Sequence, residues 1–68
     1  MLWELKKFLD EKEISQSQLA EAAGVSQAWI SNFMRGYKTP SVAVMLRIAD
    51  YLGITLDKLM ELVGVKTA

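Results

Sequence analysis

The sequence predicts an all-α fold in which five short helices pack into one compact domain. Its 68 residues are too few to give each of two domains a hydrophobic core of its own. No segment sustains the alternation of apolar and polar residues that marks a half-buried strand. Helix start and end signals, in contrast, recur along most of the chain. We expect the domain to span residues 1–64, with residues 65–68 as a frayed tail.

The first helix is expected over residues 2–12, where apolar side chains recur at the spacing of one buried helical stripe. A second helix should begin after Ser15, because Gln18 stands three residues later as the partner of a capping box. Gly24 should end this helix in the left-handed conformation. The apolar residues expected on the inner faces of these two helices are Leu2, Leu5, Phe8, Leu9, Leu19, Ala20 and Ala23.

The third helix should begin after Ser26, run to about Arg35 and stop at Gly36. The segment YKTPS that follows is expected to be a loop, since its Pro40 favours an extended entry into the next helix.

Two further helices complete the expected fold. The fourth runs from its cap at Ser41 to Gly53, and the fifth begins after its cap at Thr55. Their apolar positions at helical spacing are Val42, Met45, Leu46, Ala49 and Leu52, then Leu56, Leu59, Met60 and Val63.

The residue types in the chain exclude several classes of function. There is no Cys and no His, so disulfides, the usual zinc sites, thiol nucleophiles and a histidine general base are absent. No apolar run approaches the ~18 residues of a membrane span, and the first twelve residues resemble neither a signal peptide nor a transit peptide. We therefore expect a cytoplasmic protein that is not an enzyme, with no metal, cofactor, membrane contact or small-molecule effector domain.

The formal net charge is zero, which at first argues against nucleic acid as a partner. The charges are unevenly distributed, however. Residues 22–49 contain Arg35, Lys38 and Arg47 but no acidic residue. The acidic residues lie on both sides of this segment, so the positive field is concentrated in the middle of the chain.

The third helix of this positive segment has two faces on a helical wheel. With Ile30 set at zero, Phe33 and Met34 fall within about 60° and form an apolar face. Roughly 100° to 200° away lies a face without acidic residues, made of Ala28, Ser31, Asn32 and Arg35.

The chemistry of this face suits double-stranded DNA. An Asn or Gln side chain can pair at two points with N6 and N7 of adenine, and Ala28 can contact the methyl group of thymine. Arg35, Lys38 and the free backbone amides at the start of the fourth helix can hold phosphates.

Trp29 falls at about 260° on the same wheel, at the boundary between the two faces. In one interpretation its ring leans over Phe33 and the neighbouring helix. In the other, the ring contacts a sugar or a thymine methyl group at the rim of a DNA groove. A single aromatic ring can do both.

The second and third helices, joined by a tight turn at Gly24, have the pattern of a helix-turn-helix. From Leu5 to Leu59 the chain resembles the XRE-like, or Cro and lambda-repressor-type, helix-turn-helix family. The matching text is ISQSQLAEAAGVSQAWISNFMRG, then YKTPS, then MLRIADYLGITLDKL. The resemblance implies a lambda-repressor-like domain of five helices, with helices 2 and 3 as the DNA-binding pair.

The resemblance also implies roles for individual residues. Positions matching Gln27, Ala28 and Asn32 read base edges in the family, and the helical wheel adds Ser31 to this set. The position matching Gln16 usually contacts a phosphate and braces the first base-reading residue. The predicted phosphate contacts are Gln16, Arg35, Lys38, Thr39 and Ser41.

Three positions in the chain depart from the family pattern. Leu9 and Met34 stand where many members place Arg and Glu, which form a partly buried ion pair. We interpret the two apolar residues as a hydrophobic substitute, because such a double replacement is often neutral or stabilising. Glu13 stands where Gly is usual, which predicts a strained or altered first loop.

Apolar residues also occur where the family usually has polar surface, at Trp3, Val44 and Tyr51. They are either scattered exposed residues, which are normal, or part of an association surface near the C-terminus. The partners in such a surface would be Leu62, Val63 and Val65.

The leading functional hypothesis is a sequence-specific DNA-binding transcription regulator, most simply a homodimeric repressor that binds an inverted repeat. It would insert the helix over residues 27–35 into the major groove of each half-site. Two alternatives stay open. The first is an antitoxin or a restriction–modification controller with the same fold. The second is a protein-interaction module that has lost DNA binding and recognises a protein partner instead.

Overall fold

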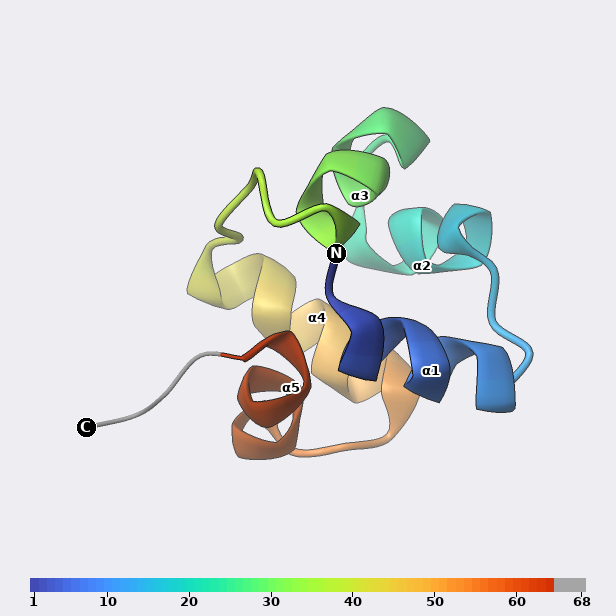
Figure 1. The fold of residues 1–68 in the computed structure, drawn as a ribbon. Helices are drawn as coiled ribbons and strands as arrows, with labels where there is room; N and C mark the ends of the chain where they lie inside the picture. The colour runs from blue at the N-terminus through green and yellow to red at the C-terminus, as the bar shows by residue number, and fades with distance from the viewer. Residues whose placement is uncertain (65–68) are drawn as a thin grey trace.

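The computed structural model describes residues 1–64 and confirms the all-α fold class (Figure 1). The predicted tail over residues 65–68, which includes Val65, lies outside the described residues. No helix among the described residues is long and apolar enough to cross a membrane. The helices are α1 (Trp3–Glu11), α2 (Gln16–Ala23), α3 (Gln27–Met34), α4 (Val42–Leu52) and α5 (Leu56–Val63).

Helices α2 to α5 begin where the sequence predicts, because each starts at a hydroxyl side chain that accepts a hydrogen bond from a backbone N–H in the first turn. At α2 the capping box is complete. The Ser15 hydroxyl accepts from the backbone N–H of Gln18 at 3.1 Å, and the Gln18 side chain accepts from the backbone N–H of Ser15 at 2.9 Å. The other confirmed caps are Ser26, Ser41 and Thr55.

The first helix has no side-chain cap. Its start is tied instead to the end of α3, because the backbone N–H of Leu2 donates to the carbonyl of Met34 at 2.6 Å. The N-terminus is thereby held against the third helix.

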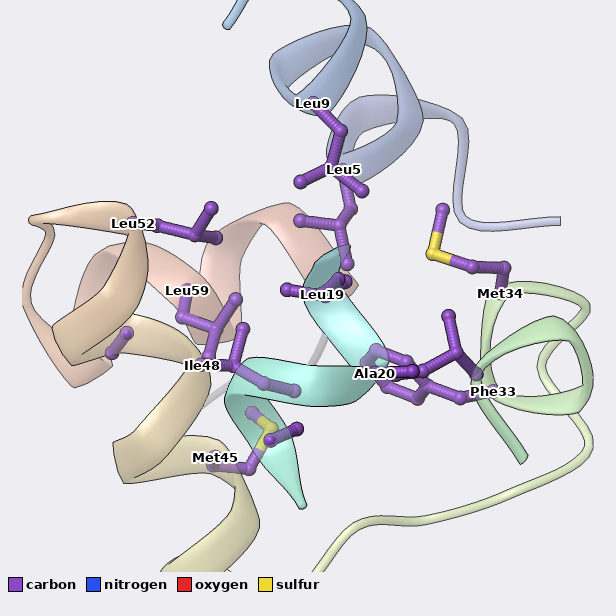
Figure 2. Close-up of a cluster of buried hydrophobic side chains, with 13 residues drawn as sticks. Leu5, Leu9, Leu19, Ala20, Phe33, Met34, Met45, Ile48, Leu52 and Leu59 are labelled. Carbon is purple, nitrogen blue, oxygen red and sulfur yellow. The ribbon is translucent and has the colours of Figure 1, made fainter. Parts of the chain in front are cut away.

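The core is one cluster of buried apolar side chains to which all five helices contribute (Figure 2). Within the described part of the chain, no polar or charged residue is buried. Helix α2 packs against both α3 and α4, and α5 packs against α1 and α4. Leu9 and Met34 are both buried in this cluster, as expected if they substitute for a partly buried ion pair.

The loop between α1 and α2 is strained at Glu13, as the departure from the family pattern predicts. Its φ is 57°, which makes it the one residue other than Gly with a positive φ among the described residues. For an L-residue this left-handed conformation costs roughly 1–2 kcal/mol, because Cβ comes too close to the following carbonyl oxygen. Gly adopts it without that cost.

We therefore expect Glu13→Gly to raise the free energy of unfolding by about 0.5–1 kcal/mol. The measurement is urea denaturation followed by circular dichroism. Glu21→Gly is the matched control, since it removes the same charge from an exposed position inside α2 and should lower stability by about 1 kcal/mol. Equal destabilisation by both variants would show that the strain at Glu13 is negligible.

Candidate nucleic-acid interface

Helices α2 and α3 are joined by a turn of three residues that begins at Gly24. Gly24 has a φ of 73°, and its N–H donates to the carbonyl of Glu21 at 3.3 Å. The N–H of Val25 then donates to the carbonyl of Ala20 at 3.0 Å, which closes the end of α2. The predicted left-handed helix end is confirmed.

The turn is also held from α4, by a contact that the sequence did not reveal. Nη1 of Arg47 donates to the carbonyl of Ala23 at 3.4 Å, so a cation lies at the negative end of α2. A Cβ built on Gly24 would lie 3.4 Å from the same Nη1 atom. Since this is close to an ordinary van der Waals distance, Gly24 is required for its left-handed backbone conformation rather than for space.

The two faces of α3 have the burial that the helical wheel predicts. Ile30, Phe33 and Met34 are buried in the core. On the other side, Gln27 and Ala28 are exposed, whereas Ser31 and Asn32 are half-buried. The polar face contains no acidic residue, and it adjoins solvent where a nucleic acid could approach.

Gln27, the first residue of α3, is held by a contact with α2. Its Nε2 donates to the Ser17 hydroxyl at 2.8 Å. The sequence predicts that Gln16 braces this side chain. In the structure the hydrogen bond goes to its neighbour Ser17, and bracing by Gln16 stays a prediction. The second N–H of the amide and its Oε1 atom are free to pair with a base edge.

The residues predicted to contact phosphates, Gln16, Arg35, Lys38, Thr39 and Ser41, are all exposed. Arg35 lies just beyond the end of α3 and not within it, because the helix ends at Met34. The Ser41 hydroxyl accepts from the N–H of Val44 at 3.3 Å, and its own O–H is still available as a donor. Lys38 and Thr39 line a groove that also includes Phe33, which places them beside the end of α3.

The ion pairs found among residues 1–64 do not involve the residues predicted to contact phosphates. They join Lys6 to Asp10 at 3.0 Å and Lys58 to Glu61 at 3.8 Å. Neither involves Arg35 or Lys38, so within the described residues both cations are available to an external anion.

Residues 5–59 match a family model described as helix-turn-helix. The chain belongs to the helix-turn-helix family. The match begins and ends where the resemblance to XRE-like proteins does, and it confirms that resemblance.

A relative in this family is the HTH-type transcriptional regulator SinR of Bacillus subtilis (strain 168). It is 31% identical over 58 residues, which cover 84% of this chain and 52% of the relative. The chain therefore spans about half the length of this relative.

Within this helix-turn-helix, Trp29 packs as the first of its two interpretations predicts. Its ring stacks on that of Phe33, with centroids 5.6 Å apart and an angle of 27° between the planes. The residue is half-buried, so part of its surface still faces solvent beside the polar face of α3. Contact with a sugar or a thymine methyl group stays a prediction.

Proposed function

We propose that this chain is a sequence-specific, double-stranded DNA-binding transcription regulator that acts as a homodimeric repressor on an inverted repeat. The observation that carries the proposal is the outer face of α3. It combines exposed or half-buried amide, hydroxyl and methyl groups with no carboxylate, and its first amide is already held by Ser17 at 2.8 Å. Membership of the helix-turn-helix family and the description of the SinR relative as a transcriptional regulator support the proposal.

In this proposal α3 lies in the major groove. The amides of Gln27 and Asn32 pair with bases, most simply with adenine N6 and N7. Ala28 contacts a thymine methyl group, and Ser31 hydrogen-bonds a base edge. The phosphate contacts set the position of the helix without reading sequence. They come from Gln16, Arg35, Lys38, Thr39 and Ser41.

Repression follows from occupancy of the site. Two copies place their α3 helices in successive major grooves, on half-sites about 10 bp apart. A complex of that size over a promoter blocks polymerase.

The experiment that tests this function is a selection from a randomised duplex pool at moderate salt, followed by sequencing of the retained DNA. We expect enrichment of an inverted repeat with half-sites about one helical turn apart. Weak retention with no enriched sequence would contradict the proposal.

We expect Lys38→Ala to weaken binding to all DNA sequences alike and to reduce the slope of log K against log salt by about one, because one phosphate loses its cation. The measurement is fluorescence anisotropy across a salt series with selected and random duplexes. Lys7→Ala is the control, since it removes an exposed lysine of α1 and should leave the slope unchanged. An unchanged slope for Lys38→Ala would remove this residue from the phosphate contacts.

A second candidate function is a protein-interaction module with the same fold, as in an antitoxin. The zero net charge and the exposed apolar residues Trp3 and Tyr51 favour it. The same salt series separates the two functions, because DNA binding weakens steeply with salt. A stable complex with a protein partner and no salt-dependent DNA binding would favour the module.

A further inference from the structure

Tyr37 lies just beyond the end of α3 and displays its side chain to solvent. It is 75% exposed, more than any other large apolar residue among the described ones. Its ring does not pack against the core, and the stacking and cation–π contacts found among residues 1–64 involve other rings. The side-chain hydrogen bonds of the same residues do not include its phenol oxygen. The fold therefore does not use this side chain.

The backbone of Tyr37, in contrast, is fixed by α3. Gly36 has a φ of 86°, and its N–H donates to the carbonyl of Phe33 at 2.9 Å. The N–H of Tyr37 then donates to the carbonyl of Asn32 at 2.9 Å. These two bonds form a Schellman motif, which closes the C-terminal end of a helix. Tyr37 is thus presented from an ordered backbone that is bonded directly to Asn32.

The helix residues that Tyr37 would normally pack on are polar in this chain. In a Schellman motif the residue after the Gly often makes an apolar contact with the residue whose carbonyl it binds, or with the one before it. Here those two residues are Asn32 and Ser31, which belong to the polar face of α3. The ring of Tyr37 therefore has no apolar partner on the helix, and it adjoins the face that is proposed to read bases.

The charges around Tyr37 suit an anion, but they are few. Residues 22–49 carry three cations and no acidic residue, and Tyr37 stands between two of these cations, Arg35 and Lys38. The third, Arg47, donates to the carbonyl of Ala23 at 3.4 Å and so holds the turn between α2 and α3. A neutral donor can bind a phosphate without adding charge, and the phenol of Tyr is one of the side-chain groups that do so in protein–DNA complexes.

We propose that Tyr37 is a further DNA contact, whose phenol O–H donates to a phosphate oxygen beside the base that Asn32 reads. This inference rests on the proposed function, in which α3 lies in the major groove. The bond between the two backbones keeps Tyr37 next to Asn32, at the point where the end of the helix meets the sugar–phosphate backbone. The contact fixes the register of Asn32 on the duplex but reads no sequence itself.

The experiment is Tyr37→Phe, which removes only the phenol oxygen, measured by anisotropy across a salt series with selected and random duplexes. We expect an affinity about tenfold lower on both kinds of duplex, because a hydrogen bond to a charged group is lost. The slope of log K against log salt should not change, since a neutral donor releases no counterion. Tyr51→Phe is the matched control. It removes the same atom from the other tyrosine of the chain, which is 44% exposed in the last turn of α4.

Chemical protection tests the same contact without a mutation. Tetranitromethane nitrates exposed tyrosine rings, and mass spectrometry of the digested chain reports each tyrosine separately. In the free protein both Tyr37 and Tyr51 should react, because both are exposed. In the complex with the selected duplex, nitration of Tyr37 should fall and nitration of Tyr51 should not. Circular dichroism of the two Phe variants checks that the fold is intact.

Three results would each overturn the inference while the proposed function stands. In the first, the wild type binds the selected duplex and Tyr37→Phe binds it equally well. In the second, the loss in Tyr37→Phe is confined to duplexes with one particular base, which would make Tyr37 a base-reading residue. In the third, Tyr37 is nitrated in the complex as fast as in the free protein. Failure of the wild type to bind DNA in a salt-dependent way would overturn the proposed function and this contact together, so the two failures are distinguishable.

Discussion

Met34→Glu is expected to lower the free energy of unfolding by about 3–5 kcal/mol, because it places an unpaired carboxylate in the core. Met34 is 1% exposed, and no polar or charged residue is buried among the described residues to pair with the carboxylate. A 68-residue domain has only about 3–10 kcal/mol of stability in all, at roughly 0.05–0.15 kcal/mol per residue. Much of the variant should therefore be unfolded at 37 °C.

The double variant Leu9→Arg with Met34→Glu should recover part of that loss. It restores the ion pair that many family members place at these positions, and an ion pair is far less costly than a lone buried charge. Denaturation of the wild type, both single variants and the double variant gives the coupling energy from a double-mutant cycle. Additive losses would show that Leu9 and Met34 do not face each other and that the two departures from the family pattern are unrelated.

The helix boundaries could be predicted from the sequence because each depends on residues that are close together in the chain. The bonds between Ser15 and Gln18 form within one helical turn, and Gly24 marks the end of α2 wherever that helix packs. The two faces of α3 could be predicted for the same reason. The helical periodicity alone places Ile30 on the buried face and Ala28 on the exposed face.

The contacts that hold the candidate site could not be predicted in this way. Ser17 and Gln27 are ten residues apart, and Ala23 and Arg47 are twenty-four apart. Which side chain of α2 meets Gln27 depends on how α2 and α3 cross, and the sequence of α2 alone does not show this. The groove, similarly, exists only once α5 has packed beside the loop that follows α3.

Gln27→Ala and Asn32→Ala should each weaken binding to the selected DNA site by about 1–3 kcal/mol and relax the base preference at one position. The measurement is anisotropy with a panel of duplexes that carry every single-base change in one half-site. Affinity for random DNA should be nearly unchanged, because phosphate contacts supply most of it. An equal loss on random DNA would argue against a base-reading role for either residue.

Ser17→Ala separates the reading of a base from the bracing of the residue that reads it. The Gln27 amide is kept but is no longer held at 2.8 Å from a hydroxyl, so it must be ordered when DNA binds. Ser17→Ala should weaken binding to the selected DNA site less than Gln27→Ala does, and it should relax the base preference at the same position. The double variant Ser17→Ala with Gln27→Ala should bind no more weakly than Gln27→Ala alone. Gln16→Ala is the matched control. As a phosphate contact it should weaken all duplexes alike, whereas relaxed preference at the Gln27 position would return the bracing role to Gln16.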